Sequence, residues 1–371
     1  MRFLLPLTSA ALLVLLSSAC GSATQGDNWP PIGIRDNSVE LGKTAIGDCC
    51  YRGGVTGIQL GDFANTGEPV MAVMGQTGVV LFDPDNFRQL RTFDFEDEDG
   101  ETIWFGLSSH LLADETDFRI AMLGGGYGDV GLLDSRGETL WLFRPDADLP
   151  PAGMVVDDTP GREARFYVSG HSGLYRLDSR GEVVWQIDEP ADYLVLVNDA
   201  DAALATASHG SRTLKLWTAD GRAAGELALP VNPDGIAYVE HLENAGFVIK
   251  SGRDIAFVER SGTHRFTYRY DEAPVRHGPT AALLAMHPGQ VPQLAVRLRS
   301  ASATGKSVLT LLSLDGARLY EEYLDYGPTI AVLPGRQPVG DRLLVGEDND
   351  KVWVYEGQPG AGDSLADAAE P

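Results

Sequence analysis

Residues 173–187 read GLYRLDSRGEVVWQI, and this stretch decides the fold. Apolar and polar residues alternate up to Leu177, the segment DSRG turns the chain, and Val183 to Ile187 run back as a second strand. Nearly the same sequence occurs earlier, as GLLDSRGETLW over residues 131–141. A hairpin used twice predicts an architecture of repeated antiparallel strands.

The same turn recurs through the chain and gives the number of repeats. Its glycine stands at positions 137, 181, 221, 262 and 316, with spacings of 44, 40, 41 and 54 residues, and a flanking unit on either side makes seven. Residues 55–95 show four strands in about 40 residues, as expected for one propeller blade. No convincing helical period interrupts the pattern. We therefore expect an all-β, seven-bladed β-propeller of four-stranded antiparallel blades over residues 39–357, with eight blades as the alternative.

The last repeat lacks a fourth strand, while residues 39–44 form a short strand without a partner of its own. Joining the two would close the ring and hide two exposed strand edges. We expect residues 39–44 to be the outermost strand of the last blade. Residues 358–371, rich in Gly, Ala and Asp, are expected to be a disordered acidic tail.

The N-terminus reads as a secretory signal. Arg2 precedes an apolar run over residues 10–16, and SSA leads to Cys20. Small residues directly before a cysteine resemble the lipobox of bacterial lipoproteins, which implies cleavage after residue 19 and lipidation, including palmitate, at Cys20. A plain transmembrane anchor is the alternative, although the run is shorter than the ~20 residues that span a bilayer. Because Gly21 follows the cysteine, the resemblance implies the outer membrane, facing the periplasm, with residues 20–38 as a tether.

Charge restricts the partners. The formal net charge is -24, and no basic stripe offsets it, so nucleic acid and anionic lipid headgroups are poor partners. Contact with the membrane is expected through the N-terminal lipid only. A protein partner in the envelope is favoured, with a basic partner as one option and the chain as a monomer or part of a hetero-complex.

Cys49 and Cys50 are adjacent in a compartment expected to be oxidising. A bond between them would close across Cα atoms about 3.8 Å apart, below the usual range, so it would be strained. A structural vicinal disulfide, two free thiols, and a redox or cofactor role all remain open.

The LDSRGExxW hairpins ending at Trp141 and Trp185 resemble the repeats of quinoprotein-like propellers, and GDFANTGEPV over residues 61–70 resembles an FG-GAP or VCBS repeat. The latter resemblance implies calcium in the loop, but Asp62 is the only carboxylate there before Glu68. A lipid anchor with a quinoprotein-like propeller is also similar to scaffold lipoproteins of the outer-membrane β-barrel assembly machinery, which bind without catalysis. We expect no cofactor, with calcium as an option at this loop or at the acidic run of residues 94–101, and expect Trp141, Trp185 and Phe266 to pack between blades.

Propeller geometry brings the loops between second and third strands and the loops between blades to one face. The candidate binding residues on this face are Tyr127, His171, Asp188, Glu189, Asp192, His209, Asp234, Arg276, His277, Asp325, Asp348 and Asp350. Turns favour aspartate in any protein, so a plain solvated surface is one interpretation. The other is an acidic docking surface.

Two functions remain open. The first is a non-enzymatic, lipid-anchored scaffold that binds protein partners in the periplasm. The second is a quinone-cofactor or metal-dependent enzyme with its site at the propeller axis, for which Arg52 and Arg276 are the only cations expected on that face.

Overall fold

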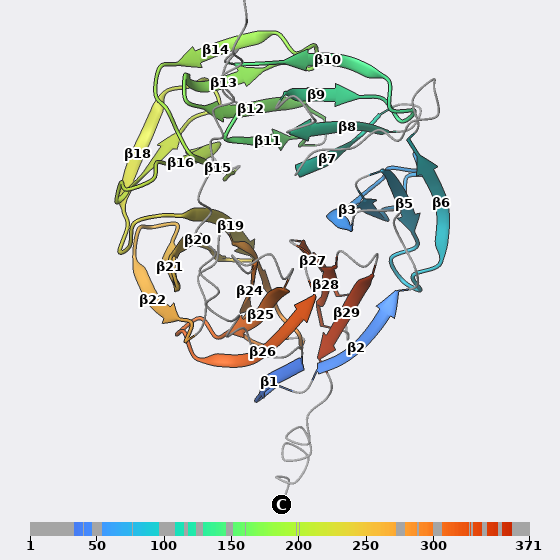
Figure 1. The fold of residues 1–371 in the computed structure, drawn as a ribbon, viewed down its shortest axis with the longest axis vertical. Coiled ribbons are helices and arrows are strands. Elements are labelled where there is room, and N and C mark those ends of the chain that lie inside the picture. The colour runs from blue at the N-terminus through green and yellow to red at the C-terminus, as the bar shows by residue number, and fades with distance from the viewer. Residues whose placement is uncertain are drawn as a thin grey trace, which may run out of the picture.

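The fold is a ring of seven antiparallel sheets, seen in a computed structural model of the chain (Figure 1). The structure describes residues 33–39, 41–46, 54–75, 77–95, 108–114, 118–123, 129–145, 151–159, 161–197, 199, 201–271, 279–287, 289–299, 306–325, 327, 329–335, 340–347 and 351–357. Within these ranges every regular element is a strand. The predicted all-β, seven-bladed propeller is confirmed, and the eight-bladed alternative is wrong.

The first four blades each use four consecutive strands, ordered from the centre of the ring outward. Blade 1 contains β3 (Val55–Gly61), β4 (Val70–Gly75), β5 (Gly78–Phe82) and β6 (Gln89–Asp94). Blade 2 contains β7 (Ser108–Ala113), β8 (Phe118–Leu123), β9 (Val130–Leu133) and β10 (Thr139–Phe143). Blade 3 contains β11 (Gly153–Asp157), β12 (Arg165–Gly170), β13 (Gly173–Leu177) and β14 (Val183–Ile187). Blade 4 contains β15 (Tyr193–Leu196), β16 (Leu204–Ala207), β17 (Thr213–Trp217) and β18 (Ala223–Ala228).

Blade 5 also uses four consecutive strands, β19 (Gly235–His241), β20 (Asn244–Ser251), β21 (Asp254–Glu259) and β22 (His264–Arg269). The last two blades, 6 and 7, each include a strand from the N-terminal segment. Blade 6 contains β23 (Thr280–Leu284), β24 (Gln293–Arg299), β25 (Lys306–Leu312) and β26 (Arg318–Asp325), with β1 (Gly33–Asn37) as a fifth strand. Blade 7 contains β27 (Ile330–Leu333), β28 (Arg342–Gly346) and β29 (Val352–Gly357), with β2 (Leu41–Ile46) as its outer strand.

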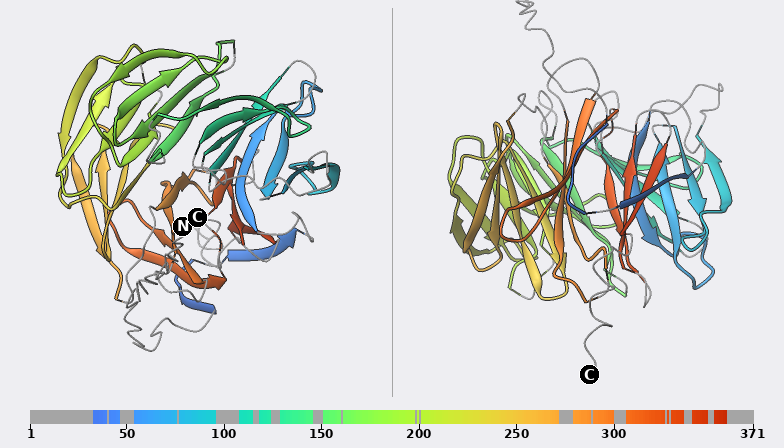
Figure 2. Two further views of the ribbon diagram at one scale, coloured as in Figure 1. Left: turned by 45° about the horizontal axis from the view of Figure 1, so that its top comes forward. Right: turned by 90° about the horizontal axis from the view of Figure 1, so that it is seen from below.

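The N-terminal segment closes the ring, as expected, but two details differ from the sequence-based prediction. The closing strand β2 pairs with β29 over Leu41–Ile46, two residues further along than residues 39–44. Residues 33–37, which we assigned to the tether, form β1 and pair with β26. Figure 2 shows these two blue strands beside the orange and red strands of blades 6 and 7. Residues 1–32 and 358–371 lie outside the described residues.

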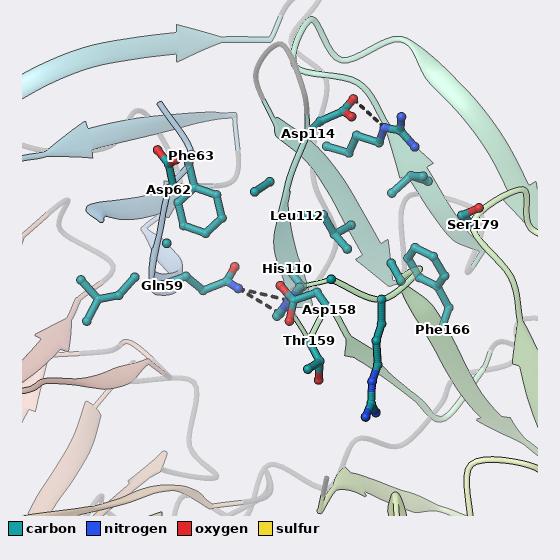
Figure 3. Close-up of a pocket in the computed structure, with 18 residues that line it drawn as sticks. Gln59, Asp62, Phe63, His110, Leu112, Asp114, Asp158, Thr159, Phe166 and Ser179 are labelled. Atoms are coloured by element: carbon teal, nitrogen blue, oxygen red, sulfur yellow. Dashed lines mark hydrogen bonds and ion pairs between the residues drawn. The ribbon is translucent and has the colours of Figure 1, made fainter. Parts of the chain in front are cut away.

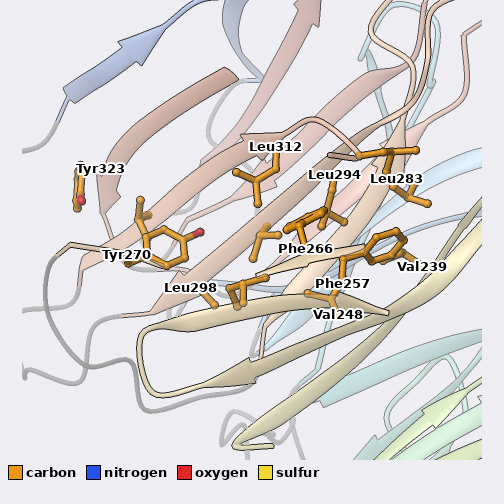
Figure 4. Packing of buried hydrophobic residues seen from close by; sticks show 14 residues of the cluster. Val239, Val248, Phe257, Phe266, Tyr270, Leu283, Leu294, Leu298, Leu312 and Tyr323 are labelled. Carbon is orange, nitrogen blue, oxygen red and sulfur yellow. The ribbon is translucent and has the colours of Figure 1, made fainter. Parts of the chain in front are cut away.

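The core is divided among seven clusters, one between each pair of neighbouring blades. Figure 4 shows the cluster between blades 5 and 6, where Phe257 and Phe266 of one blade pack against Leu294 and Leu312 of the next. The second and third strands of a blade are covered on both faces by neighbouring blades, so β4 and β5 are apolar throughout. The ring therefore has two exposed faces made only of loops, and a rim of outer strands.

Candidate functional site

The two loop faces follow from the alternation of antiparallel strands. We define the linker face as the one carrying the connections between blades and the turns between second and third strands. The cavity face carries the turns between first and second strands and between third and fourth strands. We expected the candidate residues from the sequence on the linker face.

Seven of those candidates are described, and all lie in linker-face loops or at strand ends there: His171, Asp188, Glu189, Asp192, His209, Asp234 and Asp325. His171 and His209 are exposed and occupy the same hairpin position in blades 3 and 4. Tyr127, Arg276, His277, Asp348 and Asp350 lie outside the described residues, as do Cys20, Cys49, Cys50, Arg52 and residues 96–101 of the acidic run. The docking role of this face stays a prediction.

Several linker-face carboxylates are engaged within the protein. Asp192 accepts the backbone N–H of His209 at 2.6 Å, and Glu189 forms an ion pair with Lys215. Asp234 accepts the backbone N–H of Gly252 at 2.5 Å and faces the buried ammonium of Lys250 at 3.2 Å. In blades 4 and 5, an aspartate just before the first strand thus accepts a hydrogen bond from the turn between the second and third strands.

Other groups on this face are also internally satisfied. Burial, together with the carboxylates of Asp234 and Asp192, raises the pKa of Tyr193 above its ordinary value. The fully buried Arg297 donates hydrogen bonds to the carbonyls of Thr329, Gly346 and Asp325, which joins blades 6 and 7. Of the predicted acidic residues, Asp192, Glu189 and Asp234 thus hold neighbouring loops in place.

The cavity face carries a feature that the sequence did not reveal. A cavity of about 800 Å³, here cavity 1, opens between blades 1, 2 and 3. Its lining comes from the end of β3, from β7 and its turn, and from the loop after β11 (Figure 3). Phe63, Leu112 and Phe166 supply apolar wall. Its volume lies in the range of ligand pockets, about 300–1,000 Å³.

A chain of polar side chains crosses cavity 1. The Oε1 atom of Gln59 accepts the backbone N–H of Leu111 at 2.6 Å, which turns the amide nitrogen toward Nδ1 of His110, 3.0 Å away. His110 Nε2 lies 3.1 Å from Oδ2 of Asp158. The Gln59 amide nitrogen also lies 3.3 Å from His110 Nε2, so the amide faces the edge of the ring. The imidazole thus lies between Gln59 of blade 1 and Asp158 of blade 3, and 43% of the Asp158 side chain is exposed.

Four further charged residues line cavity 1. Arg119 donates from Nε to Asp114 at 2.9 Å, while Arg162 is exposed at the mouth. Asp62 accepts the backbone N–H groups of Thr66 and Gly67, each at 2.8 Å, in the loop that resembles an FG-GAP repeat. Its carboxylate therefore caps the loop itself.

A second cavity of about 790 Å³, here cavity 2, opens on the same face between blades 5, 6 and 7. Asp341 lines it, with Oδ2 2.9 Å from His241 Nε2. The same carboxylate accepts hydrogen bonds from the backbone N–H groups of Ala285 and Gly335. Leu242 and Val291 line it and are 90% and 70% exposed. Leu242 also has a φ of 55°, a left-handed conformation that is uncommon for leucine.

Sequence reasoning missed both cavities because their residues come from different blades. Gln59, His110 and Asp158 are about 50 residues apart in sequence, as the separations of 51 and 48 show. The only local signal was a histidine beside Leu111 and Leu112 in β7, which reads SSHLLA. Among the described residues, no group of three or more His, Cys, Asp or Glu side chains could hold a metal ion. In the same part of the chain, no helix has the length and apolar character to span a membrane.

Comparison with known proteins identifies the class by fold alone. No protein-family model and no curated protein matches the chain. Among solved structures, BBS1N in complex with ARL6DN has a TM-score of 0.55 and 10% identity, covering 88% of this chain and 99% of that one. Virginiamycin B lyase from Staphylococcus aureus has a TM-score of 0.54 and 14% identity, covering 85% of this chain and 99% of that one. At such identities the likeness shows a shared β-propeller and no shared activity.

Proposed function

We propose that the chain is a lipid-anchored periplasmic protein that binds a protein partner through its cavity face, without catalysis. The observation that carries the proposal is that two cavities of about 800 and 790 Å³ and the strongly exposed Leu242 and Val291 share one face. Exposed apolar side chains beside concave polar sites are typical of protein contact surfaces. The linker-face carboxylates are less suited to this role because internal contacts engage them.

Two further observations support the partner's character and the location. The net charge of -24 favours a basic partner through electrostatic steering. The apolar run before Cys20 resembles a lipoprotein signal, which implies lipidation at Cys20 and the outer membrane. BBS1N, one of the structures with this fold, was crystallised in complex with another protein, so the fold supports such a role.

The contact is tested by photo-crosslinking in the native host. A photoreactive residue at Leu242 or Val291 should give a discrete adduct with one envelope protein. The same residue at His171, which is also exposed but lies on the linker face, should give none. Adducts at His171 alone, or at none of the three positions, would contradict the proposal.

The anchor and the absence of catalysis have separate tests. Cys20→Ser should move the protein from the membrane fraction to the soluble periplasm, and a variant that stays in the outer membrane would contradict lipid anchoring. The alternative, a quinone enzyme, predicts visible absorbance in protein purified from its own host. The scaffold proposal predicts none.

A further inference from the structure

The outer rim of the ring contains two strands that differ from the rest. Of the outer strands that the structure describes, β6, β18 and β22 carry charged residues at Arg91, Glu226, Arg265 and Arg269. Charges on an edge strand discourage pairing with other chains. β10 reads TLWLF and β14 reads VVWQI, with no charged residue in either.

These two strands also present apolar side chains to solvent. Leu140 and Leu142 of β10 are 48% and 56% exposed, and Val183 and Val184 of β14 are 48% and 49% exposed. The strands belong to neighbouring blades and lie next to one another on the rim (Figure 1). An uncharged, apolar, unpaired edge is a template for strand addition.

The chain itself shows that the outer strand of a blade can accept a further strand. β1 pairs antiparallel with β26, the outer strand of blade 6, from Gly33 opposite Tyr323 to Asn37 opposite Tyr320. β26 has a register shift near its start, and β1 uses the part beyond that shift. β10 and β14 have the same shift near their first residues. Among the described residues no strand pairs with the outer side of β10 or β14, so residues 141–143 and 185–187 are the equivalent open edges.

Charge indicates what occupies these edges. Exposed Glu182 and Asp188 bracket β14, while β10 lies between exposed Glu138 and exposed Arg144, whose guanidinium pairs with Asp129. The turn residues Arg136 and Arg180 stand two residues before Glu138 and Glu182. A second copy of the chain would bring a further -24 charges to the rim, whereas a basic segment would be attracted. The apolar Leu140 and Leu142 require apolar residues at alternate positions of the incoming strand.

We propose that the rim edges of β10 and β14 bind, by antiparallel strand addition, an extended segment of a partner protein in which apolar and basic residues alternate. This inference rests on the partner-binding role proposed above and adds a second contact, away from the cavity face.

A synthetic ten-residue peptide of alternating valine and lysine, blocked at both ends, is the probe. Its binding to the purified folded protein is measured by titration calorimetry. Leu142→Thr and Val184→Thr keep strand propensity but remove exposed apolar surface, and together they should weaken binding at least tenfold. Leu90→Thr is the matched control, because Leu90 is 43% exposed on the charged strand β6, and it should leave binding within twofold.

A second probe separates backbone pairing from charge attraction. The same peptide with every amide nitrogen methylated keeps its side chains but cannot donate backbone hydrogen bonds, and it should not bind. Equal binding of the two peptides, equal weakening by Leu90→Thr, or no binding at all would overturn the inference. So would sedimentation showing a dimer of the wild type that Leu142→Thr dissolves. None of these results would affect the adducts expected at Leu242, so the partner-binding role is tested independently.

Discussion

At the residue scale, the repeated hairpin owes its sequence to a contact between neighbouring blades. The turn glycines Gly181 and Gly221 have φ of 79° and 83°, a conformation that favours glycine. Trp141 of blade 2 covers Gly181 of blade 3, and Trp185 of blade 3 covers Gly221 of blade 4. Each indole N–H donates a hydrogen bond at 3.1 Å to a carbonyl in the turn that it covers. The tryptophan and the glycine of this motif therefore join blades, as we predicted for Trp141 and Trp185.

Replacing one of these glycines should destabilise the ring through two effects. In Gly181→Ala the new Cβ would lie 2.7 Å from the Trp141 ring, in addition to the left-handed backbone. We expect a loss of at least about 2 kcal/mol in the free energy of unfolding. Gly210→Ala, with a φ of 77° and open space around it, should lose only about 1 kcal/mol. Denaturant titration measures both, and equal losses would contradict the role of Trp141.

Glu321 gives the protein a predictable dependence on pH. Burial raises the pKa of this carboxyl, and the ion pair with Arg318 at 3.5 Å only partly offsets that effect. Because the pKa of Glu321 is higher in the folded state, the protonated carboxyl favours folding. This contribution to the free energy of unfolding is complete below the ordinary carboxyl pKa and is lost as the pH rises through the folded-state pKa. At pH 7 the buried charge is therefore destabilising.

Glu321→Gln should raise the melting temperature at pH 7 and leave it unchanged near pH 4. The control is Glu226→Gln on the exposed strand β18, which should change neither. Differential scanning calorimetry at both pH values provides the comparison. A lower melting temperature for Glu321→Gln at pH 7 would show that the carboxylate stabilises the fold.

At the element scale, the closing strand β2 is held by more than its hydrogen-bond ladder. Lys43 Nζ lies 2.7 Å from Oε1 of Glu322 in blade 6 and 4.2 Å from the centre of the Trp353 ring in blade 7. The hydroxyls of Tyr320 and Tyr355 each donate to Oε2 of Glu322 at 2.7 Å. Burial, followed by the effects of Glu322, raises the pKa of both tyrosines, so both stay donors. A lysine on the N-terminal strand thus connects the two blades at the closure.

Lys43→Met should weaken this closure, because it leaves the buried Glu322 without its cation. Removing one partner of a buried pair is expected to cost on the order of 3 kcal/mol. Lys351→Met is the matched control, since Lys351 lies 6.0 Å from the same Trp353 ring but on β29's own turn. It should cost less than about 1 kcal/mol. Equal destabilisation of the two variants, measured by chemical unfolding, would argue against the Lys43 contact.

At the element scale, strands could be predicted from sequence wherever a glycine-containing turn separates two segments in which apolar and polar residues alternate. The glycines at 137, 181, 221, 262 and 316 all have positive φ in turns between third and fourth strands, and the blade count followed from them. β1 was missed because GIRDN has no alternating pattern, and its pairing depends on the distant edge of β26. The closing strand was placed two residues early because Val39 fits a strand pattern although pairing begins at Leu41.

At the scale of the whole molecule, the chain is a closed circle in which every blade is packed between two others. The closure of the ring could be predicted because the last repeat lacked a fourth strand and residues 39–44 formed a strand without a partner of its own. The cavities could not, because cavity 1 combines Gln59, His110 and Asp158 from three blades, and nothing in the spacing of these residues indicates that their side chains meet. The linker-face residues share a face by topology, but their partners, such as Lys215 and Lys250, depend on the packed structure.

Closure predicts different results for two N-terminal truncations. A chain that begins at residue 39 loses β1 but keeps β2, so blade 7 stays four-stranded and cooperative unfolding should persist with a modest loss of stability. A chain that begins at residue 47 leaves the edge of β29 open and exposes part of the cluster containing Ile46 and Val354. It should unfold at a much lower temperature and aggregate. Similar melting curves for the two truncations would show that β2 is dispensable.

Amide hydrogen exchange of residues 41–46 in the native protein tests the central claim most directly. If β2 is the outer strand of blade 7, the alternate amides of residues 41–46 that donate to β29 should exchange slowly, and they should lose protection together with β29 in Lys43→Met. Exchange of residues 41–46 at the rate of an unstructured peptide, while β28 stays protected, would contradict a ring closed by its N-terminal strand.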